Sequence, residues 1–180
     1  MTLLVLELKV PHFEGAPTAG MLGSGLARDW PGYFAFVTSF FTVLIMWIHH
    51  HVIFRMVRGV DARLLFANGF LLLVVTGVPF PTAVIAEYLL TPAARVAAAF
   101  YAGYFVLVSL SFLVLRTTAF RPAVLDPEAP AKRIEGLRRS YWLGPPMYLL
   151  ATASAIVSPW AAMGVCTGLW LYWAVTTREC

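Results

Sequence analysis

The feature that most constrains this chain is a succession of apolar segments, all but the first of which are long enough, if helical, to cross or nearly cross a lipid bilayer. A membrane helix needs about 20 apolar residues, because each residue rises about 1.5 Å through a hydrocarbon core of about 30 Å. Of the 180 residues, 60% are hydrophobic and 12% are charged. Soluble domains average about 25% charged residues. The sequence therefore predicts an all-α integral membrane protein whose partner is the lipid bilayer, folded as one transmembrane domain over residues 1–180.

Six spans are expected, separated by short polar connections. In chain order they are 1–11 (partial), 33–54, 64–90, 95–115, 141–157 and 160–175. The third span is interrupted by a Pro-Phe-Pro sequence at 79–81. Prolines inside a helical pattern predict a kink, and the freed carbonyl groups then need donors from neighbouring helices.

Two longer connections stand out from the short ones. Residues 11–31 are expected to form a connector rich in glycine and proline. Residues 116–140 are expected to form a cytosolic linker that ends in a short amphipathic stretch. Pro145 and Pro146, which follow it, suit the first turn of a helix better than its middle.

The first span, Thr2–Pro11, is long enough for only half a membrane helix. It is apolar from Leu3 to Leu6 and closes with Glu7 and Lys9, a polar finish typical of a water interface. At about 1.5 Å per residue it covers roughly 15 Å. These residues are therefore expected to be the second half of a membrane helix whose first half is not in the sequence.

The basic residues divide unequally between the two sides of the six-span scheme. Ten lie in the 55–63 turn, the 116–139 region and the C-terminal tail, and three lie on the other side. The ten are Arg55, Arg58, Arg63, Arg116, Arg121, Lys132, Arg133, Arg138, Arg139 and Arg178, and the three are Lys9, Arg28 and Arg95. The positive-inside rule then predicts that the first side, with both termini, is cytosolic. This placement also favours topology signals over a nucleic-acid partner, despite the net charge of +4.

The most unusual polar residues inside a span are Trp47 and the three histidines that follow it. Trp47, His50 and His51 share one helix face, because they are three and four residues apart. Asn68 enters the third span from the same side and joins them as a candidate polar network. His49 lies on another face and is expected to point toward the lipid headgroups.

Four interpretations of these histidines are open: haem ligation, a transition-metal site, proton sensing, and hydrogen bonding between helices. Haem ligation needs a second membrane histidine, and the remaining one, His12, lies in a connection on the opposite side. A metal site needs further histidine, cysteine or carboxylate ligands nearby, and none is evident. Interhelical hydrogen bonding is therefore favoured, with no cofactor and no bound metal.

Glu7 admits two interpretations at the outer end of the first span. Its carboxylate either concentrates cations at a pore mouth or anchors the helix end at the interface, beside Lys9. The sequence contains no potassium-filter motif, P-loop, dinucleotide-binding motif, zinc-protease motif or pair of catalytic carboxylates. Nothing in it indicates an enzyme.

Three motifs together resemble one family of membrane proteins. They are TLLVLELKVP at the start of the chain, W-x-x-H-H-x-x-F from Trp47 to Phe54, and Asn68 followed by P-F-x-T at 79–82. Their order and spacing are similar to those of the bacterial branch of the lysosomal potassium channel family, transmembrane protein 175. The resemblance extends from residue 2 through the sixth span.

The resemblance implies a homotetrameric, potassium-permeable channel of a bacterial plasma membrane, with six helices per subunit and no re-entrant pore loop. In that family the first helix lines the pore, and large apolar side chains on it form the constriction. The matching positions here are Leu3 and Leu6, with Thr2 beside them. Rings of bulky apolar side chains can gate a pore by dewetting it.

This chain also departs from the family pattern. Family members carry an R-x-x-x-F-S-D signature in the cytosolic half of the first helix, and its serine and aspartate bond the tryptophan and histidine of the second helix. The sequence begins after that signature, so Trp47, His50, His51 and Asn68 are expected to face a gap. Either the true start codon lies upstream of Met1, which is the favoured explanation, or the chain is a truncated product.

Two other functional classes are open besides the potassium channel. A truncated chain would suit a non-conducting membrane scaffold or regulatory subunit. A secondary transporter is the third possibility, although the two halves of the chain show no convincing internal repeat.

Overall fold

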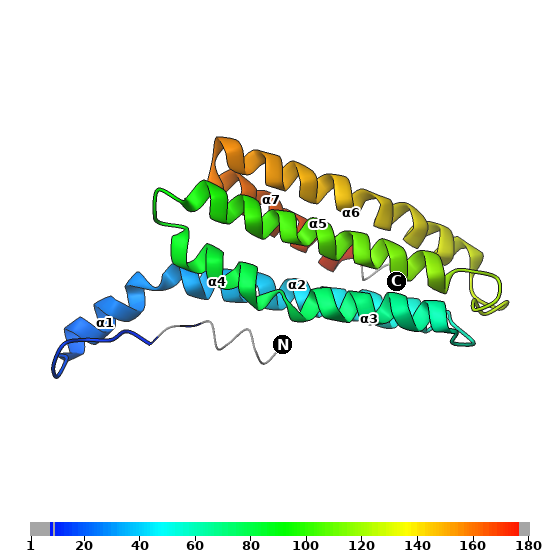
Figure 1. Ribbon diagram of the computed structural model, residues 1–180, viewed down its shortest axis with the longest axis horizontal. Helices are drawn as coiled ribbons and strands as arrows, with labels where there is room; N and C mark the ends of the chain where they lie inside the picture. The colour runs from blue at the N-terminus through cyan, green and yellow to red at the C-terminus, as the bar shows by residue number, and fades with distance from the viewer. Residues whose placement is uncertain (1–7, 9, 177–180) are drawn as a thin grey trace.

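The computed structural model describes residue 8 and residues 10–176, and within them every regular element is a helix (Figure 1). The helices are α1 (Ala19–Arg28), α2 (Trp30–Phe54), α3 (Ala62–Thr76), α4 (Pro79–Tyr88), α5 (Ala94–Ala119), α6 (Ala131–Val157) and α7 (Pro159–Thr176). Five of the six expected spans lie in this part of the chain, with α3 and α4 together making one of them. The first span, 1–11, lies almost wholly outside the described residues.

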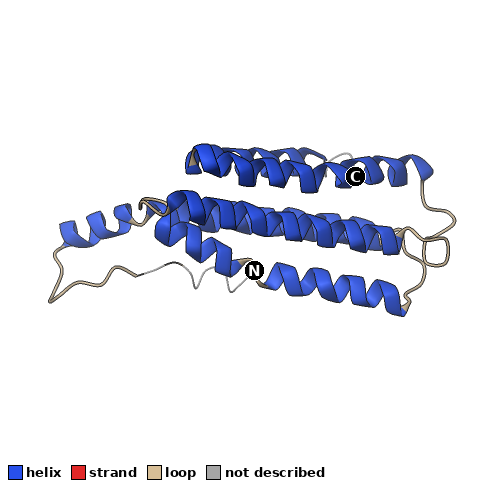
Figure 2. Cartoon of the chain, turned by 45° about the horizontal axis from the view of Figure 1, so that its top comes forward, coloured by secondary structure: helices blue, strands red, loops and turns tan. Residues whose placement is uncertain are grey.

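The long helices run side by side along the longest axis of the molecule. In Figures 1 and 2, α4 continues the path of α3, while α1 projects beyond one end of the bundle. α5 is the central helix, because it packs against α3, α4, α6 and α7. Within the described part of the chain, three segments could cross a membrane by length and composition: Trp30–Phe54, Ala62–Tyr88 and Ala94–Ala119.

The α2–α3 and α5–α6 connections meet at the same end of the bundle (Figure 1). The Arg58 N–H donates to the Val124 carbonyl at 3.0 Å, and the Asp126 N–H donates to the Met56 carbonyl at 2.8 Å. These bonds join two loops that are far apart in the sequence. They also bring most of the chain's basic residues to one end of the bundle.

The Asp61 side chain strengthens this junction. Its Oδ1 accepts the Leu64 N–H at 2.9 Å and so caps α3, and its two oxygens accept Arg121 Nη2 at 2.8 and 2.7 Å. The Leu64 N–H first, and the Arg121 guanidinium second, hold the pKa of the Asp61 carboxyl below its usual range. Asp61 therefore links the start of α3 to the loop that follows α5.

The structure adds a helix to one of the two longer connections and shortens the other. Residues 19–28 form α1 within the expected connector, with the Thr18 hydroxyl accepting the Met21 N–H at 3.3 Å. The expected linker at 116–140 is also too long, because α5 continues to Ala119 and α6 already begins at Ala131. The polar start of α6 is thus helical, and only residues 120–130 lie between the two helices.

Pro145 and Pro146 lie inside α6, contrary to the expectation that they begin a helix. An internal proline removes a backbone donor and costs roughly 3 kcal/mol in an isolated helix. Here α6 packs along α5 so closely that a Cβ added to Gly144 would lie 3.3 Å from Ser109 Cβ. Tertiary packing therefore overrides the local cost of the two prolines.

The break between α3 and α4 falls at Gly77 and Val78, directly before the Pro-Phe-Pro sequence. The Tyr104 hydroxyl of α5 donates to the Val74 carbonyl at 2.7 Å. The carbonyl next to the break thus receives a side-chain donor from a neighbouring helix. Gly77 makes this possible, because a Cβ on it would collide with the Tyr104 hydroxyl.

We expect Gly77→Ala to lower the free energy of unfolding by about 1–3 kcal/mol, because the added methyl displaces Tyr104 from the Val74 carbonyl. Thermal or denaturant unfolding in detergent measures it. Gly69→Ala is the matched control in α3, since nothing lies within 4 Å of its added Cβ. That control should be neutral, or stabilising by up to about 1 kcal/mol. Equal losses in the two variants would contradict the role given to Gly77.

We expect Asp61→Asn to lower the melting temperature at pH 7, because asparagine keeps an acceptor for Leu64 but has no charge for Arg121. The pKa of Asp61 is lowered on folding, so its carboxylate stabilises the fold above the unfolded value of about 3.9. That contribution is lost as the pH falls through the lowered, folded pKa. The melting temperatures of the wild type and the variant should therefore converge in acid.

Arg121→Gln provides the control for this titration. In that background, Asp61→Asn should change the melting temperature less than it does in the wild type. A difference between wild type and Asp61→Asn that is constant from pH 7 into strong acid would rule out the charge interaction.

Candidate functional site: polar contacts inside the helix bundle

The structure brings His50 of α2 and Asn68 of α3 together. His50 Nε2 lies 2.8 Å from Asn68 Oδ1, so with the amide oxygen as acceptor the imidazole N–H donates. The His50 ring also packs against Phe54, with ring centroids 4.5 Å apart. This contact joins α2 to α3 near the end of the bundle that carries the basic loops.

Trp47 and His51 lie together on the outer face of α2. Their rings stack with centroids 6.0 Å apart, and Trp47 is 60% exposed. Trp47 and His50 line a groove of about 610 Å³ between α2 and α3. The other residues of this groove are Val43, Leu44, Met46, Leu71, Leu72, Val75 and Phe112. The groove is apolar apart from the His50 imidazole and the Trp47 indole N–H.

The sequence suggested that His49 points toward the lipid headgroups, but in the structure it lies inside the bundle. It is 5% exposed, and the Tyr141 hydroxyl of α6 lies 3.1 Å from its Nδ1. The rings of Tyr141 and Trp173 meet it edge-on, with centroids at 5.7 and 5.6 Å. The partners lie 92 or more residues away in the chain, so helix periodicity alone could not reveal them.

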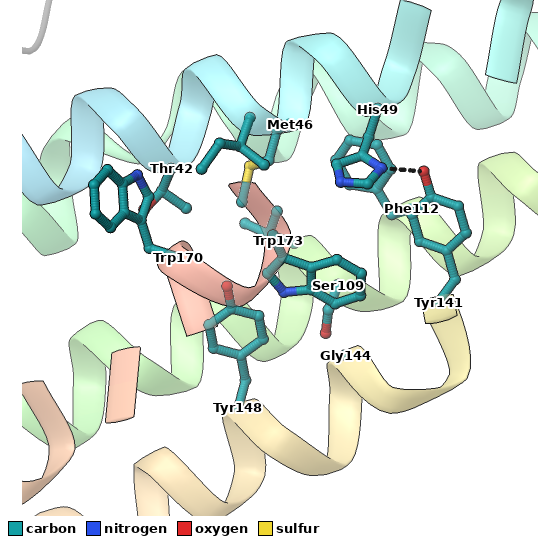
Figure 3. A pocket seen from close by; sticks show the side chains of 12 residues that line it. Thr42, Met46, His49, Ser109, Phe112, Tyr141, Gly144, Tyr148, Trp170 and Trp173 are labelled. Atoms are coloured by element: carbon teal, nitrogen blue, oxygen red, sulfur yellow. Dashed lines mark hydrogen bonds between the residues drawn. The ribbon is translucent and has the colours of Figure 1, made fainter. Parts of the chain in front are cut away.

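His49 also borders a pocket of about 50 Å³ lined by residues of α2, α5, α6 and α7 (Figure 3). Figure 3 shows Tyr141, Tyr148 and the indoles of Trp170 and Trp173 around it. No carboxylate, lysine or arginine is among the residues that line this pocket. Its aromatic lining packs between the four helices, and the Tyr141 hydroxyl lies within hydrogen-bond distance of the His49 imidazole there.

A second buried network, which the sequence analysis missed, joins three helices. Ser39 Oγ of α2 lies 2.9 Å from Thr82 Oγ1 of α4 and 2.9 Å from the Tyr101 hydroxyl of α5. Thr82 Oγ1 also donates to the Val78 carbonyl at 2.9 Å. The available signal was the presence of hydroxyl residues within apolar helices, which in lipid must find partners in neighbouring helices.

The residues expected to line the pore are outside the part of the chain that the structure describes. They are Thr2, Leu3 and Leu6, together with Glu7 at the expected pore mouth. Among the described residues, no group of three histidine, cysteine, aspartate or glutamate side chains is arranged to hold a metal ion. The described site is thus the polar framework around α2.

Long apolar helices joined by buried side-chain hydrogen bonds define a multi-pass membrane protein of the helix-bundle class. Residues 1–79 match the model of the family described as endosomal/lysosomal potassium channel TMEM175. The chain is 43% identical, over 99% of its length and 88% of the relative's, to a protein of Chamaesiphon minutus described as a potassium channel. It is 39% identical to a protein of Streptomyces collinus with the same description, covering 99% of this chain and 89% of that protein.

The fold is similar to that of a solved relative. The crystal structure of a lysosomal potassium-selective channel TMEM175 homologue from Chamaesiphon minutus matches with a TM-score of 0.87 and 43% identity. The match covers 98% of this chain and 89% of the other. The chain belongs to the TMEM175 family. This membership confirms the resemblance, the all-α membrane fold and the prediction that the protein is not an enzyme.

We expect a coupling energy of about 0.5–1.5 kcal/mol between His50 and Asn68, the range of hydrogen bonds between membrane helices. A double-mutant cycle of His50→Ala and Asn68→Ala, followed by unfolding in detergent, measures it. His51→Ala with Asn68→Ala is the control cycle, because His51 stacks on Trp47 instead. A coupling in the His50 cycle no larger than in the control would show that the contact adds nothing to stability.

Proposed function

We propose that this chain is the subunit of a potassium-permeable channel in a bacterial plasma membrane. The observation that carries the proposal is the 43% identity, over nearly the whole chain, to a protein described as a potassium channel. The TM-score of 0.87 to a homologue described as potassium-selective agrees with it.

The pore is formed by the first helix, with Leu3 and Leu6 at its constriction and Thr2 beside them. Leucines three residues apart occupy one helix face, so copies of the helix around a central axis present them as a ring. An apolar ring of this kind controls conduction by dewetting. Glu7 lies at the outer mouth, where its carboxylate attracts cations.

The first helix packs into the groove between α2 and α3. This groove is apolar, it has a volume of about 610 Å³, and Trp47 and His50 lie in its wall. Trp47, His51 and the His50–Asn68 pair form the polar network that fixes the register of the first helix. This network acts on conduction by positioning Leu3 and Leu6, without touching the ion.

The topology has both termini in the cytosol. Among the described cations, nine lie at the end of the bundle that contains the paired loops, and only Arg28 and Arg95 lie toward the other end. The nine are Arg55, Arg58, Arg63, Arg116, Arg121, Lys132, Arg133, Arg138 and Arg139. The positive-inside rule assigns that end to the cytosol. Four copies of the chain surround one pore, as the resemblance to the family implies.

We expect the protein, reconstituted into liposomes, to carry a potassium flux that Leu6→Ala increases. The smaller side chain widens the constriction and lowers the cost of wetting it. The protein is prepared in two forms: the 180-residue chain, and the product of a gene that also includes the in-frame codons upstream of Met1. Flux is followed with a potassium-sensitive dye. Leu4→Ala is the matched control, because Leu4 lies on a different face of the same helix.

Two results would overturn parts of the proposal. If neither form carries flux while size-exclusion chromatography shows a folded tetramer, the chain is a scaffold and not a channel. If Leu4→Ala changes the flux as much as Leu6→Ala does, the assignment of the constriction is wrong.

A further inference from the structure

A pocket of about 350 Å³ lies at the basic end of the bundle, between the end of α5 and the first turns of α6. It is lined by Arg116, Thr117 and Phe120 on one side and by Arg138 and Trp142 on the other. Figure 1 shows that α5 ends, and α6 begins, at the same end of the molecule. None of these five residues belongs to the polar network of α2 or to the expected pore.

The two arginines in this pocket lack a neutralising partner. Arg116 is only 3% exposed; its Nη1 donates to the Arg138 carbonyl at 3.1 Å, and its Nε has no hydrogen-bond partner among the described residues. The Arg138 guanidinium repels that of Arg116. Two other residues, Tyr141 and the exposed Glu135, act favourably on the Arg116 charge, but neither lines the pocket. Glu135 does not form an ion pair with Arg116 within the described chain.

A buried guanidinium is expensive unless an anion or a set of acceptors neutralises it. Here two guanidinium groups and the Thr117 hydroxyl border one pocket, and no carboxylate lines it. The planar guanidinium group of arginine forms paired hydrogen bonds with the oxygens of a phosphate or a carboxylate. We infer that this pocket binds the phosphate of an anionic membrane lipid.

The neighbouring surface favours a lipid over a free phosphate. Leu107, Leu110 and Val114 form an exposed apolar stripe along α5, at 40%, 42% and 44% exposure, and their spacing of three and four residues leads to Thr117. On α6, Trp142 is 63% exposed at the mouth of the pocket. Tryptophan is enriched at the level of the headgroups. A phosphate held between the arginines would thus place the acyl chains along the apolar stripe of α5.

The site would be on the inner leaflet if the basic end of the bundle is cytosolic, as proposed above. Basic pockets between helices on that side are typical binding places for anionic headgroups. A lipid bound there would neutralise the Arg116–Arg138 repulsion and hold the start of α6 against the end of α5. Lipid binding in this pocket does not depend on whether the protein conducts.

The test compares lipid binding by the purified, full chain in detergent, measured by native mass spectrometry and by thermal shift. Wild-type protein is titrated with phosphatidylglycerol, phosphatidylcholine and inorganic phosphate. Arg138→Gln removes one guanidinium of the pocket, and Arg139→Gln is the matched control, since it removes the same charge from an exposed neighbour outside the pocket. Neither variant removes the Arg138 carbonyl that Arg116 bonds.

We expect phosphatidylglycerol to bind about tenfold more tightly than phosphatidylcholine, and Arg138→Gln to weaken phosphatidylglycerol binding about tenfold, the scale of one charge-assisted hydrogen bond. Arg139→Gln should change it less than about twofold, since exposed charges contribute little. Thr117→Val, which keeps the side-chain volume, should weaken binding less than Arg138→Gln does.

Three results would overturn the inference. Equal losses in Arg138→Gln and Arg139→Gln would show attraction to net charge instead of a site. Equal binding of the two lipids would show that the pocket does not select an anionic headgroup over a zwitterionic one. Stabilisation by inorganic phosphate that matches that by phosphatidylglycerol would assign the pocket to a free anion. Each measurement stands apart from the flux assay, so loss of conduction does not affect the result.

Discussion

In a bilayer, each polar group needs a partner that the protein supplies, and this requirement organises the whole bundle. The central helix, α5, supplies several of these partners. Its Tyr104 donates to the Val74 carbonyl beside the α3–α4 break, and its Tyr101 pairs with Ser39 of α2, which in turn pairs with Thr82 of α4. Because α5 lies against α3, α4, α6 and α7, these bonds fix the positions of several helices at once. Tyr104 thus adds a donor from α5 to a carbonyl beside the break in the third span.

The two ends of the bundle are held by different interactions. At the basic end, backbone bonds join the α2–α3 and α5–α6 connections, and Asp61 pairs with Arg121. At the other end, Trp30 and Trp160 stack with ring centroids 5.9 Å apart, which joins the starts of α2 and α7. Charge and backbone bonding thus dominate at the basic end, and aromatic packing dominates at the opposite end. This asymmetry underlies both the proposed topology and the proposed lipid pocket.

Most of the fold was predictable from the sequence, and most errors occurred where polar or proline residues continue a helix. The apolar runs gave α2, α5 and α7 to within a few residues, and the Pro-Phe-Pro sequence gave the break before α4. The predicted start of the fifth span, residue 141, was ten residues later than the start of α6 at Ala131. Packing against α5 allows this helix to continue through Pro145 and Pro146. His49 was misplaced because its partners, Tyr141 and Trp173, come from helices that periodicity cannot align with α2. The pairing of His50 with Asn68 could be predicted, because the two residues lie near the same end of two consecutive spans.

The sequence by itself determined that the chain folds in a membrane, which segments are helical, and how its charges divide between two sides. These properties follow from local composition, since the length of an apolar run and the position of a charge do not depend on distant residues. Only the tertiary structure decided which polar side chains meet: Ser39 with Thr82 and Tyr101, His49 with Tyr141, and Arg116 with Arg138 across an open pocket. Such contacts depend on how helices rotate and approach one another. Side-chain packing over the whole bundle sets the rotation and approach of each helix, so they cannot be derived from any single segment.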